Sequence, residues 1–169
     1  TPEGQDVQMT VRRDGVQKDL EVPTEKEDGL ARMGVVLSAG YEFPMDVQIA
    51  VGDIGGPSAG MIFSLSVYDQ LTPGALTGGH RVAGTGTIAL DGSVGPIGGV
   101  RQKMTGAVES DADFFLAPSA NCDQVVGHEP DGLEVVAVAD FDEALTATET
   151  IAETGSAEGL PTCEDVTAR

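Results

Sequence analysis

The run Phe114-Phe115-Leu116-Ala117-Pro118 is predicted to be a strand, and it opens the stretch that decides the fold class. A short helix is expected next, near Cys122, followed by a strand at 133–138 and a helix from Phe141 to about Glu153. Strands that alternate with helices are typical of α/β architecture. We therefore predict a mixed fold, α+β or α/β, whose second half is α/β.

Residues 59–71 carry apolar side chains at 61, 62, 65 and 68, which is the spacing of one helical face. A buried helix is expected to begin at Ser58. Turn and strand signals predict the remaining elements of this part: strands at 34–40, 46–51, 85–90 and 94–97, a loop at 76–79, a turn at Asp91-Gly92 and a helix at 99–109.

The N-terminal part alternates apolar and polar residues from Val7 to Val22 on both sides of Asp14-Gly15, which predicts a β-hairpin. Residues 23–28 are charged and show no periodicity, so a linker is expected there. A single hairpin is only marginally stable in water. The hairpin is therefore expected either to pack on the later part of the chain or to be left from a truncated neighbouring domain.

Composition excludes several classes of protein. The chain has 169 residues, 40% of them hydrophobic, which is enough for one globular domain with a core of its own. A formal net charge of −19 repels phosphate backbones, so nucleic-acid binding is not expected. No apolar run reaches the roughly 18 residues of a membrane span, and the first residues show no signal-peptide pattern. We expect a soluble fragment of a longer protein, with a loose acidic tail after Thr154.

The two cysteines, Cys122 and Cys163, cannot form a structural zinc site, since that requires four ligands and neither belongs to a C-x-x-C pair. From the residues alone, two alternatives remain. They are two unrelated thiols, or they form a bridge that joins the tail to the body of the protein and requires an oxidising compartment.

The segment Gly55-Gly56-Pro57-Ser58-Ala59-Gly60 surrounds one hydroxyl with small residues where a loop enters a helix. Small neighbours leave the Ser58 Oγ accessible, and backbone N–H groups at a helix start suit a developing oxyanion. The alternative is that Ser58 merely caps the helix. A nucleophilic role requires a base.

Few residues can serve as that base. The chain has two histidines, His80 and His128, and Lys103 is the one lysine after Lys26. A lysine acts as a base only when neutral, which requires desolvation or a nearby cation. Lys103 lies on a predicted helix beside apolar and small residues, which favours this role. The alternative is an exposed helical lysine.

Other catalytic patterns fit less well. Gly56-x-Ser58-x-Gly60 matches the nucleophile elbow of α/β-hydrolases, with His128 as the histidine, but Gly52-Asp53-Ile54-Gly55 separates it from the preceding strand. A Cys122–His128 pair has no defining spacing. The chain contains no phosphate-binding loop and no dinucleotide fingerprint, so no nucleotide site is expected.

Four motifs follow the order and spacing of the proteolytic domain of Lon-type proteases, a Ser/Lys-dyad family. They are Gly56-Pro57-Ser58-Ala59-Gly60, Thr85-Gly86, Gly92-x-Val94-x-Pro96-Ile97-Gly98-Gly99 and Lys103. The resemblance covers residues 46–148. The preceding hairpin resembles the last strands of a PDZ domain, and the combination resembles the bacterial PDZ-Lon proteins, which lack an ATPase module and are anchored outside the membrane by an N-terminal helix.

The resemblance implies three parts: a hairpin and linker left from a PDZ domain at 1–28, a Lon-type proteolytic domain at 29–154 and an acidic tail at 155–169. It implies that Ser58 is the nucleophile, Lys103 the general base and Thr85 a hydroxyl that helps to hold the lysine. Gly56, Pro57, Ala59 and Gly60 form the nucleophile and oxyanion loop. Many Lon domains have an acidic residue at the position of Gly55; Asp53 is near but out of register.

The implied function is ATP-independent hydrolysis of peptide bonds in flexible or unfolded polypeptides, without cofactor or metal. The substrate is expected to lie extended beside a strand edge at 46–51. The full-length protein is expected on the extracytoplasmic face of the membrane, anchored to it, and Cys122 and Cys163 are then expected to be bridged. Lon-type domains form rings, whereas the charge of −19 favours a monomeric fragment. The alternatives are a Ser58/His128 esterase and an inactive PDZ-linked binding module.

Overall fold

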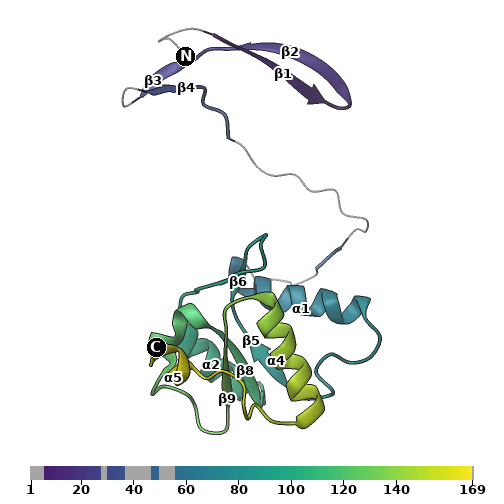
Figure 1. Ribbon diagram of the computed structural model, residues 1–169, viewed down its shortest axis with the longest axis vertical. Coiled ribbons are helices and arrows are strands. Elements are labelled where there is room, and N and C mark those ends of the chain that lie inside the picture. The colour runs from purple at the N-terminus through teal and green to yellow at the C-terminus, as the bar shows by residue number, and fades with distance from the viewer. Residues whose placement is uncertain (1–5, 28–29, 37–46, 50–55, 169) are drawn as a thin grey trace. The chain divides into compact units, whose positions relative to one another are not determined.

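The computed structural model describes residues 6–27, 30–36, 47–49 and 56–168. The chain divides into two compact units, Thr1–Asp46 and Val47–Arg169. The division falls at residue 46, whereas the first boundary expected from the sequence is at residue 28. Each unit is described by itself (Figure 1).

The first unit begins with the predicted hairpin. β1 (Val7–Arg13) pairs antiparallel with β2 (Val16–Val22), and Val7 lies opposite Val22. Asp14 and Gly15 have φ angles of 53° and 75°. Positive φ at both turn residues matches the twist of the flanking strands, which confirms the turn predicted from this dipeptide.

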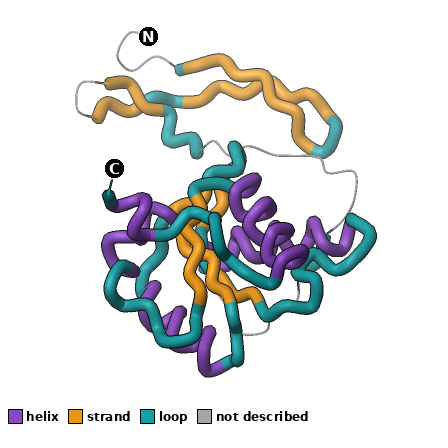
Figure 2. The backbone as a smooth tube through the Cα atoms, turned by 60° about the horizontal axis from the view of Figure 1, so that its bottom comes forward, coloured by secondary structure: helices purple, strands orange, loops and turns teal. Residues whose placement is uncertain are grey.

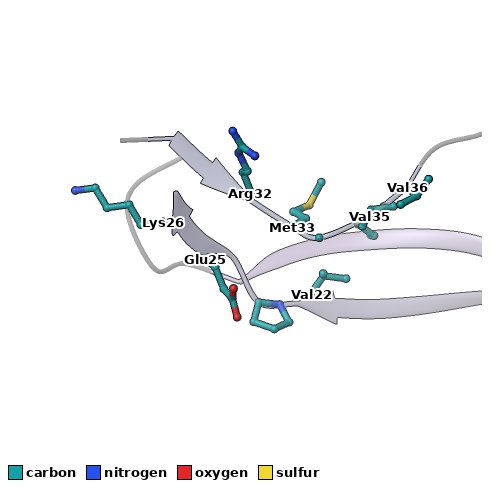
Figure 3. A pocket seen from close by; sticks show the side chains of 10 residues that line it. Val22, Glu25, Lys26, Arg32, Met33, Val35 and Val36 are labelled. Atoms are coloured by element: carbon teal, nitrogen blue, oxygen red, sulfur yellow. The ribbon is translucent and has the colours of Figure 1, made fainter. Parts of the chain in front are cut away.

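Residues 23–28 do not form the expected linker throughout. β3 (Glu25–Glu27) pairs antiparallel with β4 (Leu30–Arg32), so a second small hairpin follows the first. The charged side chains concealed this pair, although the sequence between the strands is Asp28-Gly29, another dipeptide favoured in hairpin turns. Met9, Val22, Met33, Val35 and Val36 line a groove in this unit, with Glu25, Lys26 and Arg32 beside them (Figure 3).

The strands predicted at 34–40 and 46–51 are not found in the parts of these ranges that the structure describes. Residues 34–36 and 47–49 are outside strands, and no described strand pairs with them. A β-branched run forms a strand only when a partner offers backbone hydrogen bonds. The rest of the predicted strands at 34–40 and 46–51 lies outside the described residues.

The second unit is built on a parallel sheet with the strand order β5-β8-β9. Its strands are β5 (Val82–Gly84), β8 (Phe114–Pro118) and β9 (Glu134–Val138), beside a short antiparallel pair of β6 (Thr87–Ile88) and β7 (Val94–Gly95). The helical elements are η1 (Pro57–Ala59), α1 (Gly60–Leu71), α2 (Val100–Glu109), η2 (Ser119–Asn121), α3 (Cys122–Val125), α4 (Phe141–Thr154) and α5 (Cys163–Thr167).

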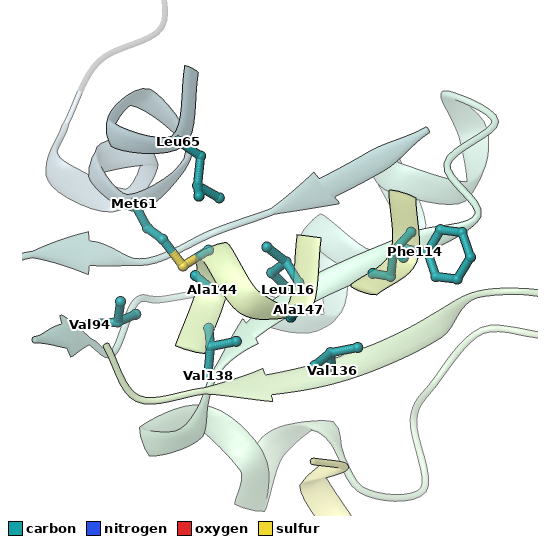
Figure 4. Packing of buried hydrophobic residues seen from close by; sticks show 10 residues of the cluster. Met61, Leu65, Val94, Phe114, Leu116, Val136, Val138, Ala144 and Ala147 are labelled. Atoms are coloured by element: carbon teal, nitrogen blue, oxygen red, sulfur yellow. The ribbon is translucent and has the colours of Figure 1, made fainter. Parts of the chain in front are cut away.

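Alternate residues of the central strand β8 enter two different hydrophobic clusters, because successive strand side chains point to opposite faces. Phe114 and Leu116 pack with α1 and α4 (Figure 4), whereas Phe115 and Ala117 pack with α2, α3 and Cys163. All five residues of β8 are buried. The helices therefore cover both faces of the sheet (Figure 2), and the predicted mixed α/β architecture is confirmed.

Most boundaries in this unit agree with the predictions, but three strands differ from them. The strand β5 was not predicted, because its glycine and alanine give a weak strand signal. The strands β6 and β7 are shorter than the predicted 85–90 and 94–97.

The expectation of a loose tail after Thr154 is wrong. Thr162 and Asp165 form a reciprocal capping box at the start of α5, and the Ala137 N–H donates to Pro161 O. Within the described residues, no helix is long and apolar enough to cross a membrane.

Candidate active site

Ser58 lies in the single turn η1, directly before α1. Gly56 precedes this turn with φ 90° and ψ 163°, and Pro57 occupies its first position. A positive φ of this size favours glycine, and proline suits a helix start because it has no N–H to leave unpaired. Neither η1 nor α1 has a side-chain cap, and the Ser58 hydroxyl makes no hydrogen bond with any described residue. The capping role is therefore not observed.

The main chain of Ser58 is held by the segment between β5 and β6. Its carbonyl oxygen accepts a hydrogen bond of 2.9 Å from Thr85 Oγ1 and another of 2.8 Å from the Gly86 N–H. The Met61 N–H then donates to Gly86 O at 3.1 Å. Thr85 is only 2% exposed. These three bonds fix the serine relative to the sheet, and its free hydroxyl remains available.

Two glycines permit this close approach. A Cβ on Gly60 would lie 3.0 Å from Ile88 Cγ2 and 3.1 Å from Ile88 N. A Cβ on Gly86, where φ is 157°, would lie 2.7 Å from Val94 Cγ1. Gly60 therefore lets α1 pack directly on β6, and Gly86 lets the serine-holding segment pack on β7. The role of Gly86 was missed, although its position beside Thr85 is a signal that could have found it.

Lys103 lies in α2, on the other side of the sheet from α1. Gly99 precedes the helix with φ 72°, and Val100, Met104 and Ala107 form its buried face. Lys103 is on the exposed face. Within the described part of the chain, the Lys103 side chain makes no hydrogen bond or ion pair. No such contact therefore links Lys103 to Ser58 or to Thr85.

Both histidines make their described contacts away from Ser58. His80 packs edge-on against Phe114, with ring centroids 5.9 Å apart. His128 is exposed, and its Nδ1 lies 3.1 Å from Val126 O. Among the described residues neither ring bonds to Ser58. The Ser58–His128 pair of the hydrolase alternative is therefore not observed among the described contacts, and neither is the Ser58–Lys103 pair.

The cysteines form a disulfide between Cys122 and Cys163, and both are buried. A bridged sulfur is no nucleophile, so the Cys122–His128 pair is excluded in this state. Asp53 and Gly55 lie outside the described residues. Within the described ranges, no group of three or more potential ligands could hold a metal ion.

The fold and the site define an α/β domain with an accessible serine fixed at the start of a helix. Residues 44–150 match the Lon protease (S16) C-terminal proteolytic domain, and the chain belongs to this family. It is thus a peptidase domain of the serine-protease type, as the resemblance predicted.

Individual relatives agree. Lon protease 2 of Bacillus subtilis is 37% identical over 92 residues, which are 54% of this chain and 16% of that protein. Lon protease 2 of Herpetosiphon aurantiacus is 38% identical over 108 residues, 60% of this chain and 13% of that protein. Lon protease of Rickettsia felis is 31% identical over 110 residues, covering 62% and 14%. The match therefore spans less than a fifth of the length of these relatives.

Proposed function

We propose that this chain is an ATP-independent endopeptidase that cleaves flexible or unfolded polypeptides through a dyad of Ser58 and Lys103. The observation that carries the proposal is the pair of hydrogen bonds on the Ser58 carbonyl, from Thr85 and Gly86. They hold the backbone of the serine, while its Oγ makes no hydrogen bond to any residue that the structure describes. Membership in a serine-protease family supports the assignment of this hydroxyl as the nucleophile.

In the proposed reaction, neutral Lys103 accepts the Ser58 proton as the oxygen attacks the scissile carbonyl. Backbone N–H groups at the helix start, with Ser58 or Ala59 among them, stabilise the oxyanion. Protonated Lys103 gives its proton to the leaving amine, and water then hydrolyses the acyl-enzyme with the same amine as base. Because Lys103 is exposed in the free chain, a bound substrate supplies the desolvation that the neutral amine needs.

The Thr85 hydroxyl can serve both partners of the dyad. It donates its one proton to Ser58 O, so its lone pairs remain able to accept from an ammonium group. In this proposal Lys103 approaches Thr85 when substrate is bound. Thr85 thereby helps to hold the lysine as well as the serine.

The substrate class follows from what the sequence lacks. The chain has no phosphate-binding loop, so we propose that it cannot couple ATP hydrolysis to unfolding and acts on segments that are already flexible. The bridged cysteines favour an oxidising location, which agrees with the proposed extracytoplasmic site of a membrane-anchored PDZ-Lon protein. The hairpin of β1 and β2 is then the end of the PDZ domain.

The test is cleavage of casein together with labelling by a fluorescent fluorophosphonate, which acylates activated serines. We expect wild-type protein to cleave and to be labelled, and both Ser58→Ala and Lys103→Ala to lose at least about 99% of the cleavage rate. His128→Ala serves as the matched control, since it removes an exposed base outside the site.

Three results would contradict the proposal. Normal cleavage by Lys103→Ala with an inactive His128→Ala would establish the hydrolase alternative. Labelling of Ser58→Ala would place the nucleophile elsewhere. A folded wild-type protein that neither cleaves nor is labelled would favour the binding module.

A further inference from the structure

Asn121 is a buried polar residue that holds both backbone groups of one residue, Ile97, just before the helix that carries the candidate base. It is 1% exposed and lies at the end of η2. Its Oδ1 accepts from the Ile97 N–H at 2.9 Å, and its Nδ2 donates to Ile97 O at 3.0 Å. One side chain therefore satisfies both backbone groups of Ile97. The side-chain amide carries both a donor and an acceptor, so it can bond to a backbone N–H and to a backbone C=O at once.

The clamped residue is the last apolar position before α2. Ile97 is followed by Gly98 and by Gly99, whose left-handed φ of 72° starts the helix that carries Lys103. No side chain caps the N-terminus of α2. The Asn121 clamp consequently fixes the point at which the chain enters this helix.

A second contact ties α2 to the same segment. Arg101 Nε donates to Gln124 O at 2.7 Å, so the first turn of α2 is bonded to α3. Below these polar contacts, Val100 and Met104 pack with Cys122 and Val125 in one hydrophobic cluster. The position of α2 on the sheet is therefore set largely by residues 119–125.

We infer that Asn121 is a positioning residue for the peptidase reaction: through Ile97 it sets the location and direction of α2, and with them the reach of Lys103 toward Ser58. Asn121 itself touches neither the substrate nor the reacting atoms. The inference rests on the proposed function, because it assigns Lys103 as the base that is positioned.

A merely structural role would lower stability without changing the rate of the folded molecules. A displaced base changes that rate, since a misplacement of about 1 Å can cost about 100-fold. The loss should also depend on the presence of the Lys103 amine. Asn121→Ala should therefore slow the wild-type enzyme, yet leave a protein that already lacks the amine at its residual rate.

The test is a double-mutant cycle of Asn121→Ala and Lys103→Ala, with the rate of fluorophosphonate labelling of Ser58 expressed per folded molecule from circular dichroism. We expect Asn121→Ala to slow labelling about 10- to 100-fold. We expect the double variant to be no slower than Lys103→Ala alone. If Asn121→Ala does not fold, Arg101→Ala is the substitute test, because it removes an exposed contact and leaves the core intact. This variant should also slow labelling.

Thr148→Ala is the matched control. Thr148 is 2% exposed and donates to Ala144 O within α4, so this variant also removes a buried polar contact. The contact lies outside the hydrophobic cluster that contains Val100 and Met104 of α2. It should keep the wild-type rate per folded molecule. Hydrogen exchange adds a measurement that does not depend on catalysis. The backbone amides of residues 97–103 should exchange faster in Asn121→Ala than in the wild type, and at the wild-type rate in Thr148→Ala.

The outcomes separate the two proposals. If Lys103→Ala is inactive while Asn121→Ala and Arg101→Ala both label at the wild-type rate, the positioning role is wrong and the dyad stands. If Asn121→Ala slows labelling equally with and without Lys103, the residue acts on something other than the base, and the inference is also overturned. If Lys103→Ala labels normally, the dyad fails and the positioning role fails with it.

Discussion

At the scale of single residues, the Ser58 carbonyl oxygen accepts two hydrogen bonds. Two donors, the Thr85 hydroxyl and the Gly86 N–H, converge on this one oxygen. These two bonds restrict movement of the Ser58 backbone while the Ser58 side chain reacts. A positioned nucleophile needs this rigidity.

The variant Thr85→Val tests this arrangement, because valine keeps the shape of threonine and removes the hydroxyl. We expect the free energy of unfolding to fall by about 1 kcal/mol, the usual loss for one hydrogen bond, and casein cleavage to fall more than stability explains. Thr85→Ser retains the hydroxyl and is the control. Equal cleavage by the valine and serine variants would show that the hydroxyl has no part in the reaction.

Replacement of Lys103 by arginine separates a proton acceptor from a positive charge. A guanidinium keeps its proton near neutral pH, so Lys103→Arg should be as inactive as Lys103→Ala. An active arginine variant would mean that Lys103 contributes charge alone.

The candidate nucleophile and base could be predicted from sequence because each lies in a short local motif. Asn121 could not, since its importance depends on contact with Ile97, which is 24 positions away. Nothing local to Asn121 distinguishes it from a surface asparagine. Long-range polar pairing of this kind has no periodic signal.

At the scale of elements, the turn between β6 and β7 is organised by one aspartate. The Ser93 hydroxyl donates to Asp91 Oδ1 at 2.7 Å and the Ser93 N–H at 3.0 Å. These donors, the hydroxyl first, hold the pKa of the Asp91 carboxyl below its usual range. The charged carboxylate is thus favoured by folding.

A lowered pKa in the folded state gives stability that is present above the ordinary pKa and lost as pH falls through the folded value. Ser93→Ala should therefore be less stable than wild type at neutral pH, and this difference should shrink at acidic pH. Urea denaturation at several pH values measures it, with the exposed Ser110→Ala as control. A difference that stays constant with pH would show that the Ser93 bonds do not depend on the charge.

Elements with a strong period were predicted well, and those that depend on partners were not. The helices α1, α2 and α4 follow apolar spacing, and β8 and β9 are apolar runs. In contrast, β3 and β4 are three residues each, and four of their six residues are charged, so only their mutual pairing defines them. Helix α5 is only five residues long and was missed, although its capping box of Thr162 and Asp165 is a local signal that could have indicated it.

At the scale of the whole molecule, the Cys122–Cys163 bridge closes a loop that contains β9 and α4, with a sequence separation of 41. The chain-entropy model gives such a loop roughly 3–4 kcal/mol. Cys163→Ser should lower stability by this amount, and reductant should then have no further effect. A thiol assay on unfolded, unreduced wild type should find no free thiol. Two free thiols would remove the argument for an oxidising compartment.

Dependence on nucleotide and metal is a second whole-molecule prediction. With no phosphate-binding loop in the sequence, the rate of casein cleavage should not change with ATP and Mg²⁺ or with a chelator. Addition of each to purified protein tests this directly. Strong stimulation by ATP would require a nucleotide site that the motifs do not indicate.

The proposed partners of the dyad come from different layers of the domain. Ser58 precedes α1, which packs with α4 on one face of the sheet, and Lys103 belongs to α2 on the other face. Their separation is consequently a measure of how the two layers are aligned across β5 and β8. A small slip between layers would misalign the dyad while every helix and strand remained intact. On heating, the cleavage rate should therefore fall at a lower temperature than the circular dichroism signal. Catalysis would then report a shift between the two layers before any secondary structure is lost.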